Sequence, residues 1–252
     1  MQDVHAPAFP SSDRLALAMV NTGSVMRHAS KQIVSVGYGA VSRLRNLSAA
    51  VLITSVAAQA ETVTIAALGD SLTAGYGLPQ AEGFVPQLEA WLQGQGADVK
   101  VINAGVSGDT TAGGLSRVNW TLTPDVDAMI VSLGGNDFLR GIDPDVSRLN
   151  LDVILSAVAE ADVALLLVGL QIGANYGPAY QTQFKSMYVD LSAKYDVPLY
   201  ADFASGLRVA AGTQADMGAF LQSDGIHPNR DGVAAIVAAM GPTILELVAA
   251  VD

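Results

Sequence analysis

The sequence contains no cysteine, so neither a disulfide nor a thiolate site can hold this protein together or carry out its chemistry. It contains only three histidines, without the histidine and cysteine clusters that bind zinc, and we expect no metal cofactor. Basic side chains are also scarce: 13 lysines and arginines accompany 24 aspartates and glutamates, for a net charge of −11. Because nucleic-acid phosphates bind to basic surfaces, we expect no nucleic-acid partner.

The few basic residues are concentrated at the N-terminus, where residues 1–60 hold five basic side chains and two acidic ones. Here Arg43-Leu44-Arg45 precedes the apolar run 47–58, and Ala58-Gln59-Ala60 has the small-x-small pattern of a cleavage site. This layout is typical of a secretory signal peptide, and the run is shorter than the roughly 20 residues of a membrane span. We therefore predict that residues 1–60 are a leader with a cleaved signal peptide, and that a periplasmic or secreted protein begins near Glu61.

Two other interpretations of this leader stay open. Residues 1–60 could instead form an amphipathic extension of the domain that follows. Signal peptides usually span about 15–30 residues, so translation could also begin at Met19 or Met26.

From Glu61 onward, short apolar runs alternate with stretches of helical periodicity. The apolar runs predict strands over 61–68, 99–102, 128–133, 163–170 and 197–201. The periodic stretches predict helices over 82–95, 110–122, 145–161, 180–195 and 229–251, the last interrupted at Gly241-Pro242. This alternation indicates an α/β fold with helices on both faces of a parallel sheet. Half of the 252 residues are hydrophobic, so residues 61–252 can bury the core of one domain.

Two of these segments are unusually apolar. The run 163–170 is the most continuous and predicts a central strand. The stretch 233–251 approaches the length of a membrane span, but Gly241, Pro242 and Glu246 interrupt it. We therefore predict an amphipathic helix that covers the sheet, and no membrane span.

Ser71 is the candidate nucleophile, because it follows the first predicted strand in Leu68-Gly69-Asp70-Ser71-Leu72. The carboxyl ends of parallel strands face the crevice where open α/β sheets bind their ligands. The alternative is a plain strand-to-helix turn, since Gly, Asp and Ser are common in turns for conformational reasons. The later motifs decide between these two interpretations.

His227 is the candidate base for Ser71, because it lies in the motif Ser223-Asp224-Gly225-Ile226-His227-Pro228-Asn229 and the other histidines lie in the leader. If the backbone makes a helix-like turn here, positions i and i+3 face the same way. Asp224 could then hold the tautomer of the imidazole while the other ring nitrogen takes the serine proton. The alternative is a capping segment, in which Asp224 and Pro228 begin the last helix.

Two further loops can supply donors for the oxyanion of a tetrahedral intermediate. Ser107-Gly108-Asp109-Thr110 follows the second strand, and Leu133-Gly134-Gly135-Asn136-Asp137 follows the third. Gly108 lets its N–H approach a ligand closely, Asn136 offers a side-chain amide, and the N–H of Ser71 is a third donor. Turn chemistry explains each loop alone, but a set of such loops at successive strand ends indicates a catalytic site.

Together these blocks resemble the SGNH, or GDSL, hydrolase superfamily: Gly69-Asp70-Ser71-Leu72, Gly108, Gly135-Asn136-Asp137 and Asp224-x-x-His227. The resemblance covers nearly all of residues 62–250. Longer stretches at 107–111, 134–141, 174–177 and 224–230 are similar to a bacterial periplasmic branch of acyl thioesterases, arylesterases and lysophospholipases. The resemblance implies a flavodoxin-like three-layer α/β/α sandwich with a central parallel sheet of about five strands.

The same resemblance implies a role for each block. Ser71 is the nucleophile, His227 the general base and then acid, and Asp224 its orienting carboxylate, while the Ser71 N–H, the Gly108 N–H and the Asn136 side chain form the oxyanion hole. The implied substrates are small-molecule acyl esters or thioesters, hydrolysed through an acyl-serine without metal or nucleotide cofactor. We expect the protein to be a monomer. The residues expected to contact the acyl chain or border its site are Phe138, Leu139, Ile172, Asn175 and Tyr176.

Three other functions stay open. A carbohydrate acetyl esterase or an acyltransferase would use the same fold and the same serine, and a non-catalytic binding module would keep the fold alone. The complete set of Ser71, Asn136, Asp224 and His227 speaks against the binding module. The chain contains no Gly-x-Ser-x-Gly motif, which disfavours the α/β-hydrolase fold.

Overall fold

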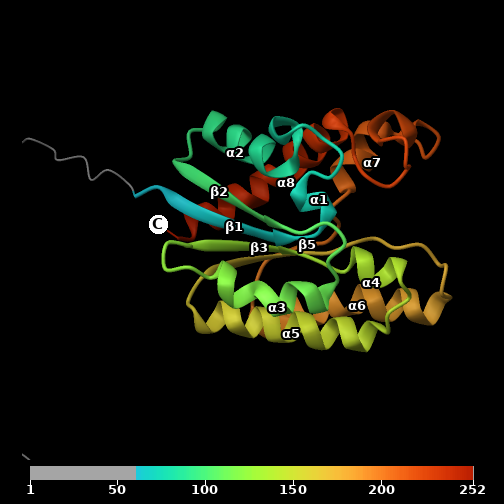
Figure 1. Cartoon of the computed structure of the whole chain (residues 1–252), viewed down its shortest axis with the longest axis horizontal. Coiled ribbons are helices and arrows are strands. Elements are labelled where there is room, and N and C mark those ends of the chain that lie inside the picture. The colour runs from blue at the N-terminus through green and yellow to red at the C-terminus, as the bar shows by residue number, and fades with distance from the viewer. Residues whose placement is uncertain (1–60, 252) are drawn as a thin grey trace, which may run out of the picture. The chain divides into compact units, whose positions relative to one another are not determined.

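The computed structural model in Figure 1 describes residues 61–251. Strands and helices alternate along this part of the chain, as the sequence predicts. The predicted leader, residues 1–60, lies outside the described residues, so the signal peptide and its cleavage site stay predictions.

The central sheet contains β1 (Val63–Gly69), β2 (Val99–Gly105), β3 (Ala128–Ser132), β4 (Ala164–Val168) and β5 (Leu199–Tyr200). All neighbouring strands are parallel, and their order is β2-β1-β3-β4-β5. Every residue of β1 and β3 is buried, as expected for parallel strands covered on both faces. This order is that of flavodoxin-like sheets, so the predicted fold class is confirmed.

Helices cover both faces of the sheet (Figure 1). One face carries α2 (Phe84–Gly94), α7 (Ser205–Ala211) and α8 (Arg230–Ala249), and the other carries α3 (Thr111–Thr121), α5 (Pro144–Glu160) and α6 (Pro178–Tyr195). A separate hydrophobic cluster fills the space between the sheet and each helical layer. The short elements are α1 (Ser71–Ala74), α4 (Gly135–Leu139) and 3₁₀ helices at Gln80–Glu82 and Asp216–Phe220.

The α8 helix continues through Gly241 and Pro242, so the predicted interruption is wrong. Nine of its residues are buried, and its packing against α2, α7 and β4 outweighs the hydrogen bond that a proline omits. A Cβ on Gly241 would collide with the Trp91 ring of α2, so this glycine permits close helix packing. Among the described helices, α8 alone has the length and hydropathy of a membrane span, and half of its most apolar window is buried inside the protein.

Two strands differ in detail from the sequence prediction. The run 163–170 contains β4, which is an interior strand, but β3 occupies the middle of the sheet. The last strand has two residues, Leu199–Tyr200, rather than the five of 197–201. Pro198 precedes it and has no N–H to donate to a neighbouring strand, so regular pairing begins only after it.

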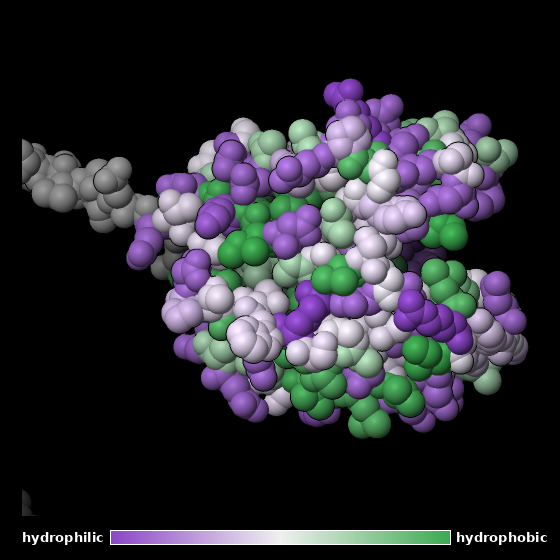
Figure 2. Space-filling view, viewed as in Figure 1, coloured by the Kyte–Doolittle hydropathy of each residue, from purple (hydrophilic) through white to green (hydrophobic). Residues whose placement is uncertain are grey.

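The strand order places a topological switch point between β1 and β3, because the connections from these strands leave in opposite directions. β1 leads directly into Asp70-Ser71, and β3 leads into Gly134-Gly135-Asn136. In Figure 1 the corresponding edge of the sheet carries α1 and α4, and in Figure 2, from the same direction, the outline of the molecule is notched there. A cleft opens at this edge.

Candidate active site

Ser71 is held at the start of α1, directly after β1. Asp70 caps this short helix, since its Oδ1 accepts a hydrogen bond from the Leu72 N–H at 3.0 Å. Gly75 ends the helix in the left-handed conformation, at a φ of 78°, which glycine adopts without strain. The first N–H groups of a helix have no acceptor within it, so the Ser71 N–H is oriented for a partner outside α1.

His227 contacts Ser71 although it lies 156 residues later in the sequence. Its Nε2 is 2.9 Å from Ser71 Oγ, and its Nδ1 is 2.6 Å from Oδ2 of Asp224. Tyr76 packs against the imidazole, with ring centroids 4.6 Å apart and an interplanar angle of 39°. The structure therefore brings the three side chains predicted from the sequence into one hydrogen-bonded series.

The backbone from Asp224 to His227 forms a turn and a bend, not the helix-like turn expected from the spacing. Oδ1 of Asp224 accepts hydrogen bonds from the N–H groups of Ile226 and His227, at 2.9 and 3.0 Å. This carboxylate therefore fixes the loop and the imidazole together. The cap of α8 is Asn229, whose Oδ1 accepts two backbone N–H bonds, so the capping interpretation of Asp224 is wrong.

Asp224 stays ionised across the neutral range. Hydrogen bonds from the His227 N–H, the His227 imidazole and the Ile226 N–H lower the pKa of its carboxyl group to about 2. A carboxylate beside Nδ1 holds the proton on that nitrogen and leaves Nε2 as an acceptor facing the serine. The arrangement can therefore accept a proton from Ser71.

Gly108 and Asn136 line the same cleft as Ser71. Gly108 has a φ of 87°, in the region that favours glycine, and its carbonyl accepts a hydrogen bond of 2.9 Å from Arg140 Nη2. Within residues 61–251, no acceptor binds the Gly108 N–H. The Asn136 Nδ2 donates a long hydrogen bond of 3.4 Å to Asp70 Oδ2. Potential donors from three strand ends thus meet in one cleft.

Asp137 ties together the two loops that carry Gly108 and Asn136. Its carboxylate is 1% exposed and accepts bonds from the Thr111 N–H at 2.8 Å, the Thr111 hydroxyl at 2.6 Å and the Ser147 hydroxyl at 2.9 Å. Thr111 begins α3, where a negative charge also complements the helix dipole. A buried carboxylate with three donors therefore fixes α4 against the start of α3.

Arg117 of α3 holds two strand ends in place. Its Nη2 and Nη1 donate to the carbonyl oxygens of Gly69 and Ala104, which lie at the ends of β1 and β2. Its Nε donates to Asp109, the residue after Gly108, at 2.7 Å. One guanidinium therefore positions the strand before Ser71 and the loop of Gly108, a role that no motif in the sequence indicated.

Asp70 is a second carboxyl group beside the serine, and it is 4% exposed. Burial raises its pKa to about 6, although hydrogen bonds from the Leu72 N–H and the Asn136 side chain lower it. Sequence reasoning included Asp70 only as part of the serine motif and did not single out Tyr76. The feature of the sequence that could have pointed to Asp70 and Tyr76 is their closeness to Ser71, since they lie one residue before it and five residues after it.

The cleft beside Ser71 has a volume of about 270 Å³. Of the five side chains predicted to contact the acyl chain or border its site, Leu139 lines it. The other four lie outside its lining: Phe138, Ile172, Asn175 and Tyr176. Phe138 and Tyr176 pack edge to face with centroids 5.8 Å apart, so these two rings hold α4 against the segment before α6.

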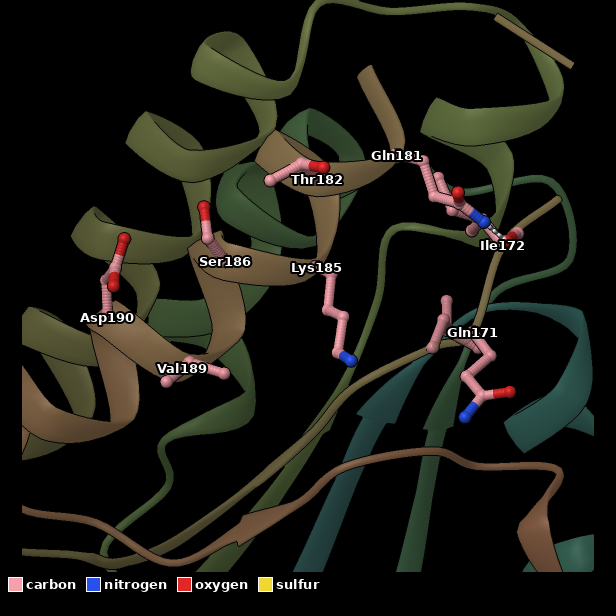
Figure 3. Close-up of a pocket in the computed structure, with 9 residues that line it drawn as sticks. Gln171, Ile172, Gln181, Thr182, Lys185, Ser186, Val189 and Asp190 are labelled. Carbon is pink, nitrogen blue, oxygen red and sulfur yellow. Dashed lines mark hydrogen bonds between the residues drawn. The ribbon is translucent and has the colours of Figure 1, made fainter. Parts of the chain in front are cut away.

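Ile172 lies beside a different and larger cavity, of about 600 Å³, between α6 and the segment after β4. Figure 3 shows Lys185 of α6 extending into this space toward Gln171, and Gln181 lying beside Ile172. The Gln181 Nε2 donates to the Ile172 carbonyl oxygen at 2.8 Å. Contact between Ile172 and an acyl chain therefore stays a prediction.

Known proteins resemble this chain in sequence and in structure. Residues 67–235 match the GDSL-like lipase/acylhydrolase family. Esterase TesA of Pseudomonas aeruginosa is 37% identical over 183 residues, which cover 72% of this chain and 88% of the relative. Thioesterase 1/protease 1/lysophospholipase L1 of Escherichia coli K12 is 37% identical over 182 residues, covering 72% and 82%. The crystal structure of AlinE4, an SGNH-hydrolase family esterase, matches with a TM-score of 0.60 at 39% identity, covering 74% of this chain and 97% of AlinE4.

The structural similarity agrees with the fold. The family match spans more than half of the chain and includes Ser71, Gly108, Asn136, Asp224 and His227. The chain is therefore a hydrolase that acts on ester bonds, and it belongs to the GDSL-like lipase/acylhydrolase family, the SGNH hydrolases.

Proposed function

We propose that the protein is a serine esterase that hydrolyses acyl esters and thioesters through a covalent acyl-serine intermediate. The observation that carries this proposal is the 2.9 Å distance between Ser71 Oγ and His227 Nε2, with Asp224 bound to the opposite ring nitrogen. A serine hydroxyl is a weak nucleophile until a base within hydrogen-bond distance takes its proton. Relatives named as an esterase and as a thioesterase/lysophospholipase support this substrate class.

In the acylation step, Ser71 Oγ bonds to the substrate carbonyl carbon while its proton passes to His227 Nε2. The carbonyl oxygen becomes an oxyanion and accepts hydrogen bonds from the N–H groups of Ser71 and Gly108 and from Asn136 Nδ2. The bond from the carbonyl carbon to the leaving oxygen or sulfur then breaks. The leaving group takes the proton from Nε2, and the acyl group stays on Ser71.

In the deacylation step, water attacks the acyl carbon while its proton passes to His227 Nε2. The second oxyanion uses the same three donors and collapses when the bond to Ser71 Oγ breaks. Ser71 recovers its proton, and the carboxylic acid leaves. Asp224 remains ionised throughout and stabilises the imidazolium that forms in each step.

The test is hydrolysis of p-nitrophenyl esters from acetyl to palmitoyl by the full-length chain. We expect the highest activity above acetyl, and a loss of roughly 10⁴- to 10⁶-fold in kcat for Ser71→Ala, because the nucleophile is removed. Ser156→Ala on α5 is the matched control and should retain wild-type activity, since its hydroxyl contacts only Glu160 on the surface.

Other outcomes would redirect the proposal. Activity that survives Ser71→Ala would show that another group is the nucleophile. Hydrolysis of the acetyl ester alone would favour a carbohydrate acetyl esterase, and preferential transfer of the acyl group to an added alcohol would favour an acyltransferase.

We also propose that the enzyme is exported to the periplasm or secreted. The support is the order of Arg43-Leu44-Arg45, the apolar run 47–58 and Ala58-Gln59-Ala60 in the sequence. N-terminal sequencing of the exported protein should find a start near Glu61. A mature N-terminus before residue 40 would contradict the proposal.

A further inference from the structure

An apolar cavity lies beside the loop that carries His227. It has a volume of about 170 Å³, and every residue that lines it is apolar or glycine. Phe203, Leu207 and Ile236 contribute to its lining and belong to the buried core between the sheet and α8. Protein interiors are close-packed and seldom leave such a volume empty, so this cavity is a candidate binding site.

The cavity adjoins the active-site cleft, because Leu72 and Ile226 line both. Leu72 follows Ser71, and Ile226 precedes His227. The Ile226 residue is 55% exposed, so little packing holds its side chain in one rotamer at this shared wall. Leu72 and Ile226 therefore form a shared wall between the two spaces, next to Ser71 and His227.

The position of the cavity decides which half of the ester can reach it. Gly108 and Asn136 line the cleft but not this cavity, whereas Ile226 and Pro228, the two neighbours of His227, both line it. When the ester bond breaks, the alcohol oxygen takes the proton from His227 Nε2, so the alcohol lies on the histidine side of the carbonyl carbon. The acyl group remains on Ser71.

We propose that this cavity binds the alcohol half of the substrate, and that the preferred alcohol carries a neutral ring about the size of benzene. The inference rests on the proposed function, because it requires an ester at Ser71. Apolar cavities of about 150 Å³ lined by aliphatic and aromatic side chains bind benzene in other proteins, which sets the size of the group. No charged side chain lines the cavity, so a charged alcohol would lose its hydration without gaining a partner.

Two ratios of kcat/KM, measured on the full-length protein, separate the alcohol half from the acyl half. The first compares benzyl acetate with ethyl acetate, which differ only in the alcohol. The second compares ethyl hexanoate with ethyl acetate, which differ only in the acyl group. If the cavity binds the alcohol half, a substitution that alters the cavity should change the first ratio and leave the second unchanged.

Substitutions at Met217 can either fill or enlarge the cavity, because its partly buried side chain lines the cavity and packs against the core. Met217→Trp places a ring in the cavity and should lower the benzyl-to-ethyl ratio about 10- to 100-fold, the effect of excluding one buried aromatic group. Met217→Ala widens the cavity and should raise the kcat/KM for naphthylmethyl acetate relative to benzyl acetate about tenfold. The acyl ratio should stay at the wild-type value in both variants.

Val209→Trp and Val209→Ala are the matched controls, since Val209 is 81% exposed on α7 and lies outside the lining of the cavity. Wild-type alcohol ratios in both Met217 variants would overturn the proposal. A changed acyl ratio would also overturn it, because the cavity would then bind the acyl group. If the melting temperature shows that Met217→Trp does not fold, Met217→Ala decides by the same ratios.

Failure of this inference is distinguishable from failure of the proposed function. Activity that survives Ser71→Ala overturns the proposed function. Unchanged ratios in active Met217 variants, together with the loss of activity in Ser71→Ala, overturn only the assignment of the cavity.

Discussion

The serine side and the histidine side of the candidate active site are held in place by different means. On the serine side, Ser71 and Asn136 follow adjacent strands of the sheet, and buried polar groups tie their loops together. Asp137 accepts three hydrogen bonds there, and Arg117 donates to two strand ends and to Asp109. Ser71 and Asn136 therefore follow strands in which every residue is buried, whereas Gly108 follows the partly exposed edge strand β2.

On the histidine side, Asp224 and His227 lie on a loop that is open to solvent. Their side chains are 37% and 17% exposed. An antiparallel bridge between Leu221 and Pro228 closes the loop, and Asn229 caps the helix that follows. The Gln222 Nε2 also donates to the carbonyl oxygens of Tyr76 and Pro228, at 2.8 and 2.9 Å. Tyr76 packs against the imidazole, and an apolar cavity also lies next to this loop.

This difference suits two chemical tasks. Stabilisation of an oxyanion depends on donors that are fixed before the substrate arrives, because fixed dipoles need no reorganisation during the reaction. In the proposed mechanism, His227 instead gives a proton to the leaving alcohol and later takes one from water. A loop beside open space can admit leaving groups of different size. We therefore expect changes on the serine side to affect kcat and stability, and changes beside His227 to affect kcat and alcohol selectivity.

Asp224→Asn should cause the largest loss, about 10⁴-fold in kcat, because an amide beside Nδ1 favours the wrong imidazole tautomer. The measurement is kcat with p-nitrophenyl butyrate, together with the melting temperature. Asp231→Asn is the matched control in the first turn of α8 and should retain activity. A loss below tenfold in Asp224→Asn would remove the carboxylate from the proposed mechanism.

Asn136→Ala should lower kcat by about 10²- to 10³-fold with little change in KM, since the lost donor binds the oxyanion and not the ground-state substrate. Steady-state kinetics with the same ester measure both constants. Asn119→Ala, on the exposed face of α3, is the control and should behave as wild type. An increase in KM at unchanged kcat would instead assign Asn136 to substrate binding.

Asp70→Asn should change how stability depends on pH. The folded-state pKa of Asp70 is raised by burial to about 6 from its ordinary value of 3.8, so between these values the native state holds a proton that the unfolded state releases. Stability contributed by this group is complete below about pH 4 and is lost as the pH rises through about 6, by about 3 kcal/mol. Urea unfolding between pH 4 and 8 should show this decline in the wild type and not in Asp70→Asn. Equal slopes in the two proteins would contradict the buried, protonated state.

Arg117→Met should lower the free energy of unfolding by about 2 kcal/mol, because it removes charge-assisted hydrogen bonds to two strand ends and to Asp109. Thermal unfolding should show a melting temperature about 4–8 °C lower. Arg148→Met is the matched control and should cost less than about 1 kcal/mol, because its pair with Asp190 is more exposed. Equal losses in the two variants would mean that the strand-end contacts contribute little.

Much of the serine side could be predicted from the sequence. Each of its groups follows an apolar run that forms a parallel strand, and parallel strands bring their carboxyl ends to one edge of the sheet. The positions of Ser71, Gly108 and Asn136 at the cleft therefore follow from local patterns and one general rule. Predicting these positions required neither the register of the strands nor their exact bounds.

Local sequence patterns failed in two places, for different reasons. Gly241-Pro242 predicted a break, but burial of α8 against the sheet and α2 keeps the helix continuous. The spacing of Asp224 and His227 predicted a helix-like turn, but the carboxylate bonds to backbone N–H groups in a non-helical turn. At α8 tertiary packing outweighed the local preference, whereas at Asp224 the deciding hydrogen bonds are local, to N–H groups two and three residues later.

The sequence by itself determined the order of the five strands and the five long helices, the α/β class and the identity of the candidate catalytic residues, because these depend on periodicity and short motifs. It did not predict the short helices α1, α4 and α7. Only the tertiary structure decided that His227 reaches Ser71 across 156 residues, that Arg117 joins two strand ends, and that an apolar cavity lies on the histidine side. These features join residues far apart in the chain, so they exist only once the helices have packed on the sheet.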